Sequence, residues 1–379
     1  MIFVIATRLI TVFLLLGTVL RSTCLAQINL DEDVAYHGAY LFWDGDAKLT
    51  MALRGRFFEP EKDGAVRRLA LDRVITPAVF RSIGKKSTDF DDAARDLMYD
   101  RLSPFLADGE SRESLKMRVI GRGGAATLTL PKTDSGGHFA ITTATAGNQS
   151  LVELVGNGRD LLVHAVLPEG DKRQDRFTVR LRVPPKRLPL LVVSDVDDTV
   201  RIAEVTNRAR MIERVFLQRY EAVPGMSAVY RQLADRGAQF HFVSGSPWQI
   251  APLIEGMLAD SKFPPATLHC RNIGWDFWNG DPLDTHRFKV ETIESLLQRF
   301  DSRKVLLVGD DGEHDPEVYR DICRDHPDRV AGVWIRRVRE TWDATRLAEP
   351  TKLLGPARAV AFEHSSELEQ ALEKIEISR

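Results

Sequence analysis

The chain has 379 residues, of which 44% are hydrophobic and 28% charged, a composition typical of globular proteins with two or three domains. Its 52 Lys and Arg residues nearly balance its 54 Asp and Glu residues, leaving a formal net charge of -2. This balance excludes a global basic field, so we expect no nucleic-acid partner, and any attraction to anionic membranes must come from a local patch.

The first 26 residues differ from the rest. Arg8 precedes an apolar run over residues 9–20, and the small residues Cys24 and Ala26 precede Gln27. The run is short for a membrane span and typical of a signal peptide cleaved before Gln27. We therefore predict a signal peptide over residues 1–26 and an exported protein that is periplasmic, in the cell envelope or secreted. A retained N-terminal anchor is the alternative.

Two cysteines lie beyond this leader, Cys270 and Cys323. An oxidising compartment would allow them to pair, but their sequence separation says nothing about their proximity. We expect two free, mostly buried thiols.

Residues 27–187 contain short stretches with the pattern of β-strands, separated by Gly, Pro and Asp. Period-two alternation is clear at residues 48–56 and 126–130. Further strand candidates are residues 115–120, 138–143, 161–167 and 176–183, with one helix at about residues 89–106. The pattern predicts a small antiparallel β-sandwich domain with an inserted helix. No catalytic pair with recognisable spacing occurs in it, so its role is not readable from the residues.

A proline-rich linker at residues 184–189 precedes a different pattern in residues 188–379. Short apolar strands are predicted at residues 190–194, 239–243, 304–308 and 331–335. Helical periodicity lies between them: Val205, Ala209, Ile212 and Phe216 share one face, as do Val290, Ile293, Leu296 and Leu297. Alternating strands and helices predict an α/β domain with a doubly wound parallel sheet.

Three of these strands are followed by polar clusters. The first strand leads into Asp195, Asp197 and Thr199, the second ends at Ser244, and the third leads into residues 309–315. Because ligands bind beyond the carboxyl ends of parallel strands, these groups should meet at one edge of the sheet. Their oxygens would suit Mg²⁺ and a phosphate group.

This set of residues predicts phosphoryl transfer. A carboxylate can attack phosphorus and form a covalent aspartyl phosphate, and a second carboxyl two residues later can act as general acid and base. A Ser hydroxyl and a Lys ammonium would hold the transferred oxygens, and Lys289 is the candidate ammonium.

The motifs D-V-D-D-T, V-S-G-S-P-W, H-R-F-K and V-G-D-D-G-E-H-D-P-E-V-Y occur in the order of the four motifs of haloacid dehalogenase superfamily phosphatases. More narrowly, they resemble the actin-patch-protein type of phosphatidate phosphatase catalytic domain, which is related to lipin. The segment Thr206-Asn207-Arg208-Ala209-Arg210-Met211 is similar to one that follows the first motif in that family. The resemblance covers about residues 188–336 and implies a haloacid-dehalogenase-like fold and Mg²⁺ dependence. The β domain before it also looks like one found in bacterial members.

The resemblance implies roles for individual residues. The catalytic positions are Asp195 as nucleophile, Asp197 as general acid and base, Thr199 as a loop-steadying residue, Ser244 as the phosphate-binding hydroxyl and Lys289 as the motif lysine. The metal positions are Asp195, Asp197 through its backbone carbonyl, Asp310, and Asp315 as an outer carboxylate. Asp311 departs from the family, where Ser is common; this third acid either tunes metal affinity or points to solvent.

Three functions remain open at this stage. The resemblance favours hydrolysis of phosphatidate or a related lipid phosphomonoester, with anionic lipid at a membrane surface as partner. The alternatives are an exported phosphatase for a soluble ester and, less favoured, a non-catalytic binding module. Arg208, Arg210 and Arg214 would meet lipid headgroups or form a solvated helix face. His241 and His269 are expected to be structural, and Asp198 to form only local hydrogen bonds.

Overall fold

The computed structural model describes residues 32–45, 47–59, 73, 76–173, 177–186, 190–272, 282–301 and 303–375. The predicted signal peptide, residues 187–189 of the predicted linker, and Trp275, Phe277 and Trp278 lie outside this described part. None of the helices in the described part has the length and apolarity to span a bilayer.

Two antiparallel sheets form the N-terminal half. The first contains β1 (Asp33–Tyr36), β2 (Tyr40–Asp44), β3 (Lys48–Glu59), β4 (Asp108–Gly109) and β7 (His138–Thr143), with β3 at its centre. The second has the order β11 (Thr178–Arg182), β10 (Asp160–Ala165), β5 (Lys116–Gly121), β6 (Gly124–Thr129). A short hairpin of β8 (Thr145–Ala146) and β9 (Gln149–Ser150) leads into α5 (Leu151–Val155).

The two sheets share one core. Alternate residues of β3, including Met51 and Leu53, are buried together with Met117 and Val119 of β5. Because side chains of a strand alternate between faces, one face of each sheet can be fully apolar and pack against the other. We call this unit the sandwich, and its strands β3, β5, β6, β7, β10 and β11 occur where the sequence predicted strands. The alternation did not reveal β1 and β2, which are short and carry many aromatic residues.

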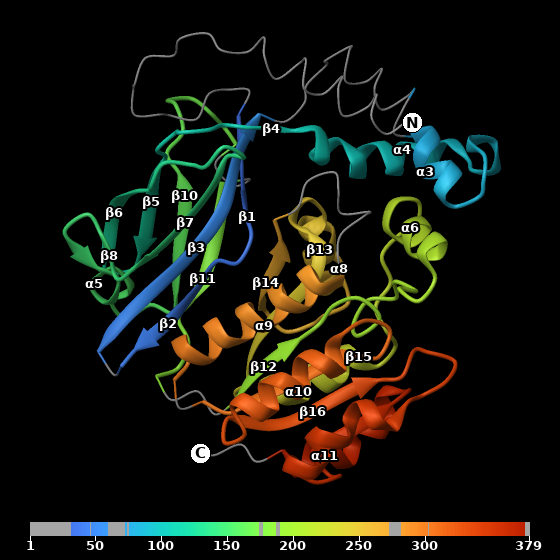
Figure 1. Cartoon of the computed structure of the whole chain (residues 1–379). Coiled ribbons are helices and arrows are strands. Elements are labelled where there is room, and N and C mark those ends of the chain that lie inside the picture. The colour runs from blue at the N-terminus through green and yellow to red at the C-terminus, as the bar shows by residue number, and fades with distance from the viewer. Residues whose placement is uncertain are drawn as a thin grey trace.

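Two helices within this half of the sequence pack elsewhere. They are α3 (Thr76–Ser82) and α4 (Asp92–Leu102), which begins at Asp91, whose side chain accepts a hydrogen bond from the Ala94 amide. Met98 and Leu102 are buried in the same core as α6 (Arg208–Phe216), and the rings of Phe105 and Phe216 lie 6.2 Å apart. Figure 1 shows α3 and α4 beside α6, away from the sandwich sheets.

The C-terminal half is built on a six-stranded parallel sheet. Its order is β14 (Ala266–Arg271), β13 (Gln239–Pro247), β12 (Leu191–Ser194), β15 (Val305–Asp310), β16 (Val330–Arg336), β17 (Ala359–Phe362). Every neighbouring pair is parallel. The chain first winds outward from β12 to β14 and then restarts at β15 on the other side of β12.

Helices cover both faces of this sheet, in agreement with the prediction of a doubly wound domain (Figure 1). Val192 faces a core with residues of α7 (Met226–Asp235), α8 (Ala251–Asp260) and α12 (Glu369–Lys374). Leu191 and Val193 face the opposite core, with residues of α9 (Pro282–Arg299), α10 (Asp315–Asp325) and α11 (Ala348–Leu354). Strands buried on both faces account for the continuous apolar runs in the sequence.

The sandwich packs against the parallel sheet at the edge formed by β14. Tyr40 and Phe42 of β2 share a core with Phe300, which follows α9, and the rings of Tyr40 and Phe300 are 6.1 Å apart. This contact joins the two halves of the chain along α9 and β14.

Candidate active site

Asp195 and Asp310 lie at the point where the strand order of the parallel sheet reverses. Asp195 follows β12, Asp310 ends β15, and these strands are direct neighbours; the Asp195 amide donates to the Val308 carbonyl at 2.8 Å. Where the chain leaves two neighbouring strands in opposite directions, no connecting helix covers the carboxyl ends of these strands. Ligands of such sheets bind at this point. The topology therefore brings together residues 115 positions apart, as predicted.

A third carboxylate joins them. Carboxylate oxygens of Asp195, Asp310 and Asp315 lie within 4.8 Å of one another, and all three residues are buried. Asp315 begins α10, and its Oδ2 accepts a hydrogen bond from the Asp310 amide at 3.2 Å. A Cβ at Gly309 would lie 2.4 Å from this oxygen, so glycine at that position lets Asp315 approach the strand.

Lys289 of α9 is the cation of this cluster. Its Nζ donates to Asp195 Oδ1 at 2.7 Å and to Asp315 Oδ1 at 2.5 Å, and the side chain is 2% exposed. Burial by itself would lower the pKa of Lys289, but Asp195, Asp315 and Glu313 raise it well above the usual value. Lys289 is thus a permanent ammonium beside the predicted nucleophile.

The carboxylates outnumber this cation. Burial raises the pKa of Asp195 well above its ordinary value, opposed by Lys289 and reinforced by Asp315 and Asp197. Burial likewise raises the pKa of Asp310, and Asp315 and Asp195 add to the effect. The cluster contains three buried carboxyl groups but only one described ammonium, so it lacks positive charge. All of its potential ligand atoms are oxygens. This donor set fits a hard divalent cation.

The loop after β12 is shaped by local hydrogen bonds. Thr199 Oγ1 lies 3.2 Å from Asp195 Oδ2 and 3.4 Å from Asp310 Oδ2, so its hydroxyl bridges the two acids. Asp198 has a positive φ of 56°, and its carboxylate accepts hydrogen bonds from the amides of Ala203, Glu204 and Val205. Asp198 therefore forms local hydrogen bonds, as expected, and stabilises the turn that presents Thr199.

The side chain of Asp197 is not part of the three-carboxylate cluster. Its Oδ1 accepts a hydrogen bond from Arg201 Nε at 2.7 Å, and its Oδ2 accepts one from Ser246 Oγ at 2.8 Å. Ser244 Oγ is 3.5 Å from the same Oδ2 and accepts from the Ser246 amide at 3.0 Å. Asp197 and Ser244 thus meet on the β13 side of the site, while the metal-binding role proposed for Asp197 concerns its backbone carbonyl.

Asp311 points neither to solvent nor into the carboxylate cluster. It is fully buried, and its Oδ1 accepts hydrogen bonds from the amides of Val338 at 2.6 Å and Arg339 at 3.1 Å. Of the two alternatives for Asp311, the solvent-exposed one is therefore wrong, because the loop after β16 closes over it.

Three residues of the site were not predicted from the sequence: Arg201 and Ser246, which are partners of Asp197, and Glu313, whose Oε2 is 3.9 Å from Lys289 Nζ. Arg201 is 1% exposed, and its guanidinium lies over the Tyr220 ring at 4.3 Å. A signal existed in each case: Arg201 follows the first motif, Ser246 follows Ser244 by two residues, and Glu313 lies within the last motif.

Two cysteines, two histidines and one tryptophan outside the carboxylate cluster are buried. Cys270 and Cys323 are free and buried, as expected. His241 and His269 are buried and hydrogen-bond to each other, with Nδ1 and Nε2 2.9 Å apart, which agrees with a structural role for His241. Trp248 is buried against Phe58, so it is a core residue.

A carboxylate cluster with a buried lysine, at the point where the strand order of a parallel sheet reverses, defines an α/β domain with a site suited to a cation and an anionic group. Residues 190–337 match the family model described as phosphatidate phosphatase APP1, catalytic domain.

Two curated proteins are similar to part of the chain. The chain is 30% identical over 149 residues to phosphatidate phosphatase APP1 of Saccharomyces cerevisiae, an alignment that covers 38% of this chain and 25% of the yeast protein. It is 27% identical over 165 residues to an uncharacterised protein of Schizosaccharomyces pombe, which covers 42% of this chain and 27% of that protein. The chain thus spans about a quarter of the length of these relatives.

Proposed function

We propose that this protein is a Mg²⁺-dependent phosphatase that hydrolyses a phosphomonoester through a phosphorylated aspartate, Asp195, on a haloacid-dehalogenase-like fold. The observation that carries the proposal is the buried contact of Asp195 with Lys289 inside the carboxylate cluster. A carboxylate in a site that neutralises the charge of an incoming phosphate is a competent nucleophile.

In the first step, a carboxylate oxygen of Asp195 forms a bond to phosphorus, and the ester P–O bond breaks. The departing alkoxide takes a proton from the Asp197 carboxyl group. In the second step, water gives a proton to Asp197 and its oxygen attacks phosphorus. Inorganic phosphate leaves, and the Asp195 carboxylate is restored.

The other residues position this chemistry. Lys289 and the Ser244 hydroxyl would hold the phosphoryl oxygens, and Thr199 steadies the Asp195 carboxylate by its hydrogen bond. Arg201 and Ser246 fix the direction of the Asp197 carboxyl group. Asp195, Asp310 and Asp315, with the backbone carbonyl of Asp197, would hold Mg²⁺, which when bound neutralises phosphate charge.

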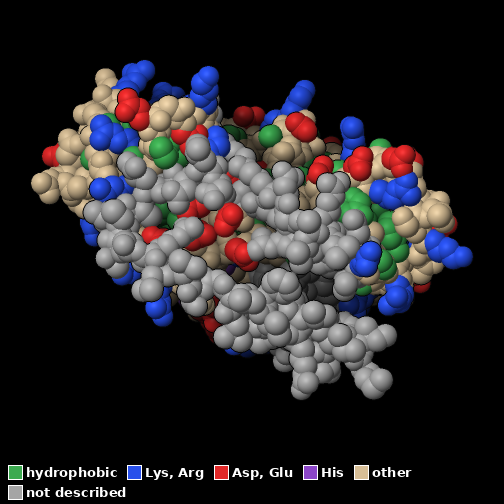
Figure 2. Space-filling view, turned by 90° about the horizontal axis from the view of Figure 1, so that it is seen from above, with side chains coloured by type: hydrophobic (Ala, Val, Ile, Leu, Met, Phe, Trp, Pro, Cys, Tyr) green, Lys and Arg blue, Asp and Glu red, His purple; other side chains and the backbone are tan. Residues whose placement is uncertain are grey.

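For the substrate, we propose phosphatidate or a related lipid phosphomonoester. The support is the match of residues 190–337 to the catalytic-domain family model. A soluble ester remains the second candidate, because one observation favours it: the arginines of α6 already contact acids. Arg210 and Arg214 lie 3.1 and 3.4 Å from Glu204 carboxylate oxygens. The face seen in Figure 2 also intersperses Lys and Arg with Asp and Glu in its coloured part, without one continuous basic patch.

A panel of phosphate esters tests this function. Phosphatidate in mixed micelles, glycerol 3-phosphate and p-nitrophenyl phosphate would be assayed with purified protein and Mg²⁺, beside Asp195→Asn. We expect release of phosphate from phosphatidate and none from the variant, because the substitution removes the nucleophile but little volume. Turnover by Asp195→Asn would refute the mechanism, whereas turnover of soluble esters alone would favour the second substrate class. Absence of turnover on every ester would leave a binding module.

Export is a separate proposal, supported by the apolar run at residues 9–20 and the small residues before Gln27. N-terminal sequencing should read Gln27-Ile28-Asn29 in an envelope or extracellular fraction. Intact Met1 in a cytoplasmic pool would contradict export.

A further inference from the structure

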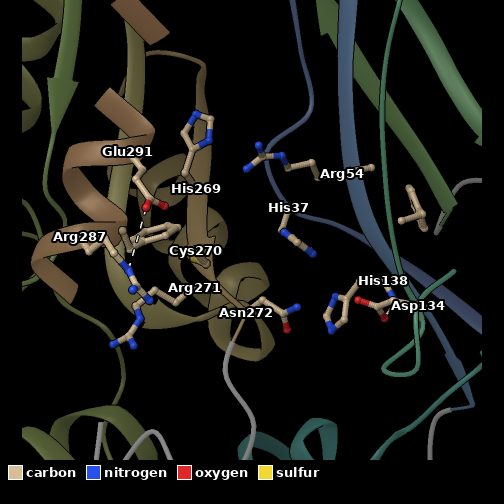
Figure 3. Close-up of a pocket in the computed structure, with 13 residues that line it drawn as sticks. His37, Arg54, Asp134, His138, His269, Cys270, Arg271, Asn272, Arg287 and Glu291 are labelled. Carbon is tan, nitrogen blue, oxygen red and sulfur yellow. Dashed lines mark hydrogen bonds and ion pairs between the residues drawn. The ribbon is translucent and has the colours of Figure 1, made fainter. Parts of the chain in front are cut away.

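A cavity of about 510 Å³ lies between the sandwich and the parallel sheet. From the sandwich it is lined by His37, Arg54, Asp134 and His138, and from the sheet side by residues that include His269 and Asn272. Figure 3 shows Arg54, His37 and His138 facing His269 and Asn272 across this space. The volume is in the range of small-molecule sites.

The two halves approach closely at the wall of this cavity. A Cβ at Gly38 would lie 3.3 Å from Nδ1 of His269 and 3.9 Å from Cδ of Arg54. Gly38 also has a φ of +91°, which a side chain would strain. Glycine at this position lets the loop between β1 and β2 approach His269. His37 of this loop and Arg54 of β3 therefore lie on the same side of the cavity.

Hydrogen bonds fix which nitrogen of His269 carries its proton. The Gln239 amide nitrogen lies 3.2 Å from His241 Nε2 and is a donor, so that ring nitrogen accepts. Burial lowers the pKa of His241 to about 3, so the ring is neutral and carries its proton on Nδ1. His241 Nδ1 then donates to His269 Nε2 at 2.9 Å. Because His269 is neutral as well, its proton lies on Nδ1, the atom that faces Gly38 and Arg54.

Two more ring nitrogens of the cavity lack partners. His37 Nε2 and His138 Nδ1 are buried, and no described residue hydrogen-bonds to either atom. Buried polar atoms without partners are costly, so such a pair in a cavity indicates a polar occupant. The two rings are 5.9 Å apart, close enough to contact one small group.

Arg54 supplies positive charge to the same space. Its side chain is exposed, and no carboxylate of the described residues forms an ion pair with it. Asp134, the acid of the sandwich wall, accepts hydrogen bonds from the amides of Gly136 and His138 at 2.8 and 2.9 Å. Its charge is therefore directed to its own turn.

We propose that this cavity is a binding site for a phosphomonoester anion, held by the guanidinium of Arg54, the Nδ1–H of His269 and the ring nitrogens of His37 and His138. An arginine and the neutral N–H group of His269, converging from two elements, match an anion with several terminal oxygens. The β-sandwich thereby gains a role, because it contributes Arg54, His37 and His138.

The cavity is connected to the carboxylate cluster through one chain of contacts. Arg271, at the end of β14, donates to Thr285 Oγ1 of α9 at 2.7 Å. Thr285 Cγ2 lies 2.9 Å from where a Cβ of Gly245 would be, and Gly245 separates Ser244 from Ser246. The anion site thus lies beside the loop that positions Asp197.

Binding is tested by NMR of histidine side chains in protein carrying Asp195→Asn, so that the probe is not hydrolysed. One arm titrates glycerol 3-phosphate, and the other adds phosphatidylcholine vesicles with or without phosphatidate. We expect saturable shifts of the His37, His138 and His269 signals, at least ten-fold weaker affinity in Arg54→Gln, and partial recovery in Arg54→Lys. Arg118→Gln, an exposed arginine on β5, is the matched control and should bind like the parent.

Response only to phosphatidate would identify a lipid headgroup as the ligand, and response only to glycerol 3-phosphate a soluble ester. Unchanged histidine signals in both arms, or equal affinity of Arg54→Gln and Arg118→Gln, would overturn the proposal. If Arg54→Gln is unfolded by circular dichroism, His138→Ala takes its place, because His138 is one of the proposed ligands, and weaker binding is again expected. The site rests on the proposed function only for the choice of probe, and because binding is read without turnover, an inactive phosphatase would leave this test valid.

Discussion

Nζ of Lys289 lies 2.7 Å from Oδ1 of Asp195, although the two residues are 94 positions apart in the sequence. Both are buried, and the same ammonium also contacts Asp315. This contact joins α9 and α10 to the end of β12, so one cation connects the predicted nucleophile to the metal-binding edge of the sheet.

Lys289→Met should therefore affect both activity and stability. We expect a loss of roughly 10²–10³-fold in kcat, because a donor to the transferred phosphoryl group is removed. Metal-free protein should lose about 3–5 kcal/mol of unfolding free energy, since buried carboxylates lose their cation. Urea denaturation with and without Mg²⁺ measures the second effect. Lys48→Met, which removes an exposed ion pair with Asp44, is the control and should change little.

Divalent cations should stabilise the folded protein and be needed for turnover. Mg²⁺ binding to the three buried carboxylates should add about 2.7 kcal/mol at 100 times the dissociation constant. EDTA should abolish activity, and Mg²⁺ should restore it. Thermal unfolding and calorimetric titration with Mg²⁺ provide a readout without activity. Asp310→Asn should require much more Mg²⁺ in both; full activity after EDTA would contradict a metal at this site.

Arg201 is expected to act by positioning Asp197. Arg201→Lys should lower kcat more than it raises KM, because Asp197 loses its directed hydrogen bond but the charge stays. The loss should be larger for alkyl phosphates than for p-nitrophenyl phosphate, whose leaving group needs no proton. Arg180→Lys, on an exposed arginine of β11, serves as control. An equal loss on both substrates would mean that Arg201 only supports the fold.

Asp311 should matter for stability and not for metal binding. Asp311→Ala removes the acceptor of two buried amides, and we expect a loss of about 1–3 kcal/mol for each unsatisfied group. Asp311→Asn keeps an oxygen acceptor and should cost much less. Chemical denaturation compares the variants, and Mg²⁺ titration should give the parent affinity for both. A large shift in Mg²⁺ affinity for Asp311→Asn would instead make it a ligand.

The arginines of α6 test the lipid substrate. Replacing Arg208, Arg210 and Arg214 by Gln should weaken activity on phosphatidate vesicles and spare a soluble ester, because each surface arginine adds about 1 kcal/mol of attraction to anionic lipid. Activity of the parent on vesicles should also fall as salt rises through roughly 0.1–0.5 M, where the Debye length drops below ~10 Å.

Glu204→Gln is the reciprocal variant, because Glu204 contacts Arg210 and Arg214. It should remove the nearest acid from both guanidinium groups and increase activity on the vesicles, while the 3.6 Å contacts of Arg210 with Glu213 and of Arg214 with Glu221 remain. Equal effects of the arginine replacements on vesicles and soluble ester would show that these arginines serve the fold or catalysis.

Much of the parallel-sheet half could be predicted from sequence. The apolar runs at residues 190–194, 239–243, 304–308 and 331–335 correspond to β12, β13, β15 and β16, because strands buried on both faces consist mainly of apolar residues. The end of each strand then determines where Asp195, Ser244 and Asp310 must lie. Local order along the chain was sufficient to predict that these residues lie at one edge of the sheet, where Asp195 and Asp310 share the carboxylate cluster and Ser244 lies beside Asp197.

Only the tertiary structure decided which side chains face each other within the site. The sequence shows that Asp311 follows Asp310. It cannot show that the loop after β16 buries the Asp311 side chain and donates two hydrogen bonds to one of its carboxylate oxygens. Likewise, the cavity between His37 and His269 depends on packing between segments more than 200 residues apart, and no local pattern specifies that packing. The sequence by itself determined the elements and the chemistry at their ends, because these follow from local burial and spacing; long-range packing decided the partners.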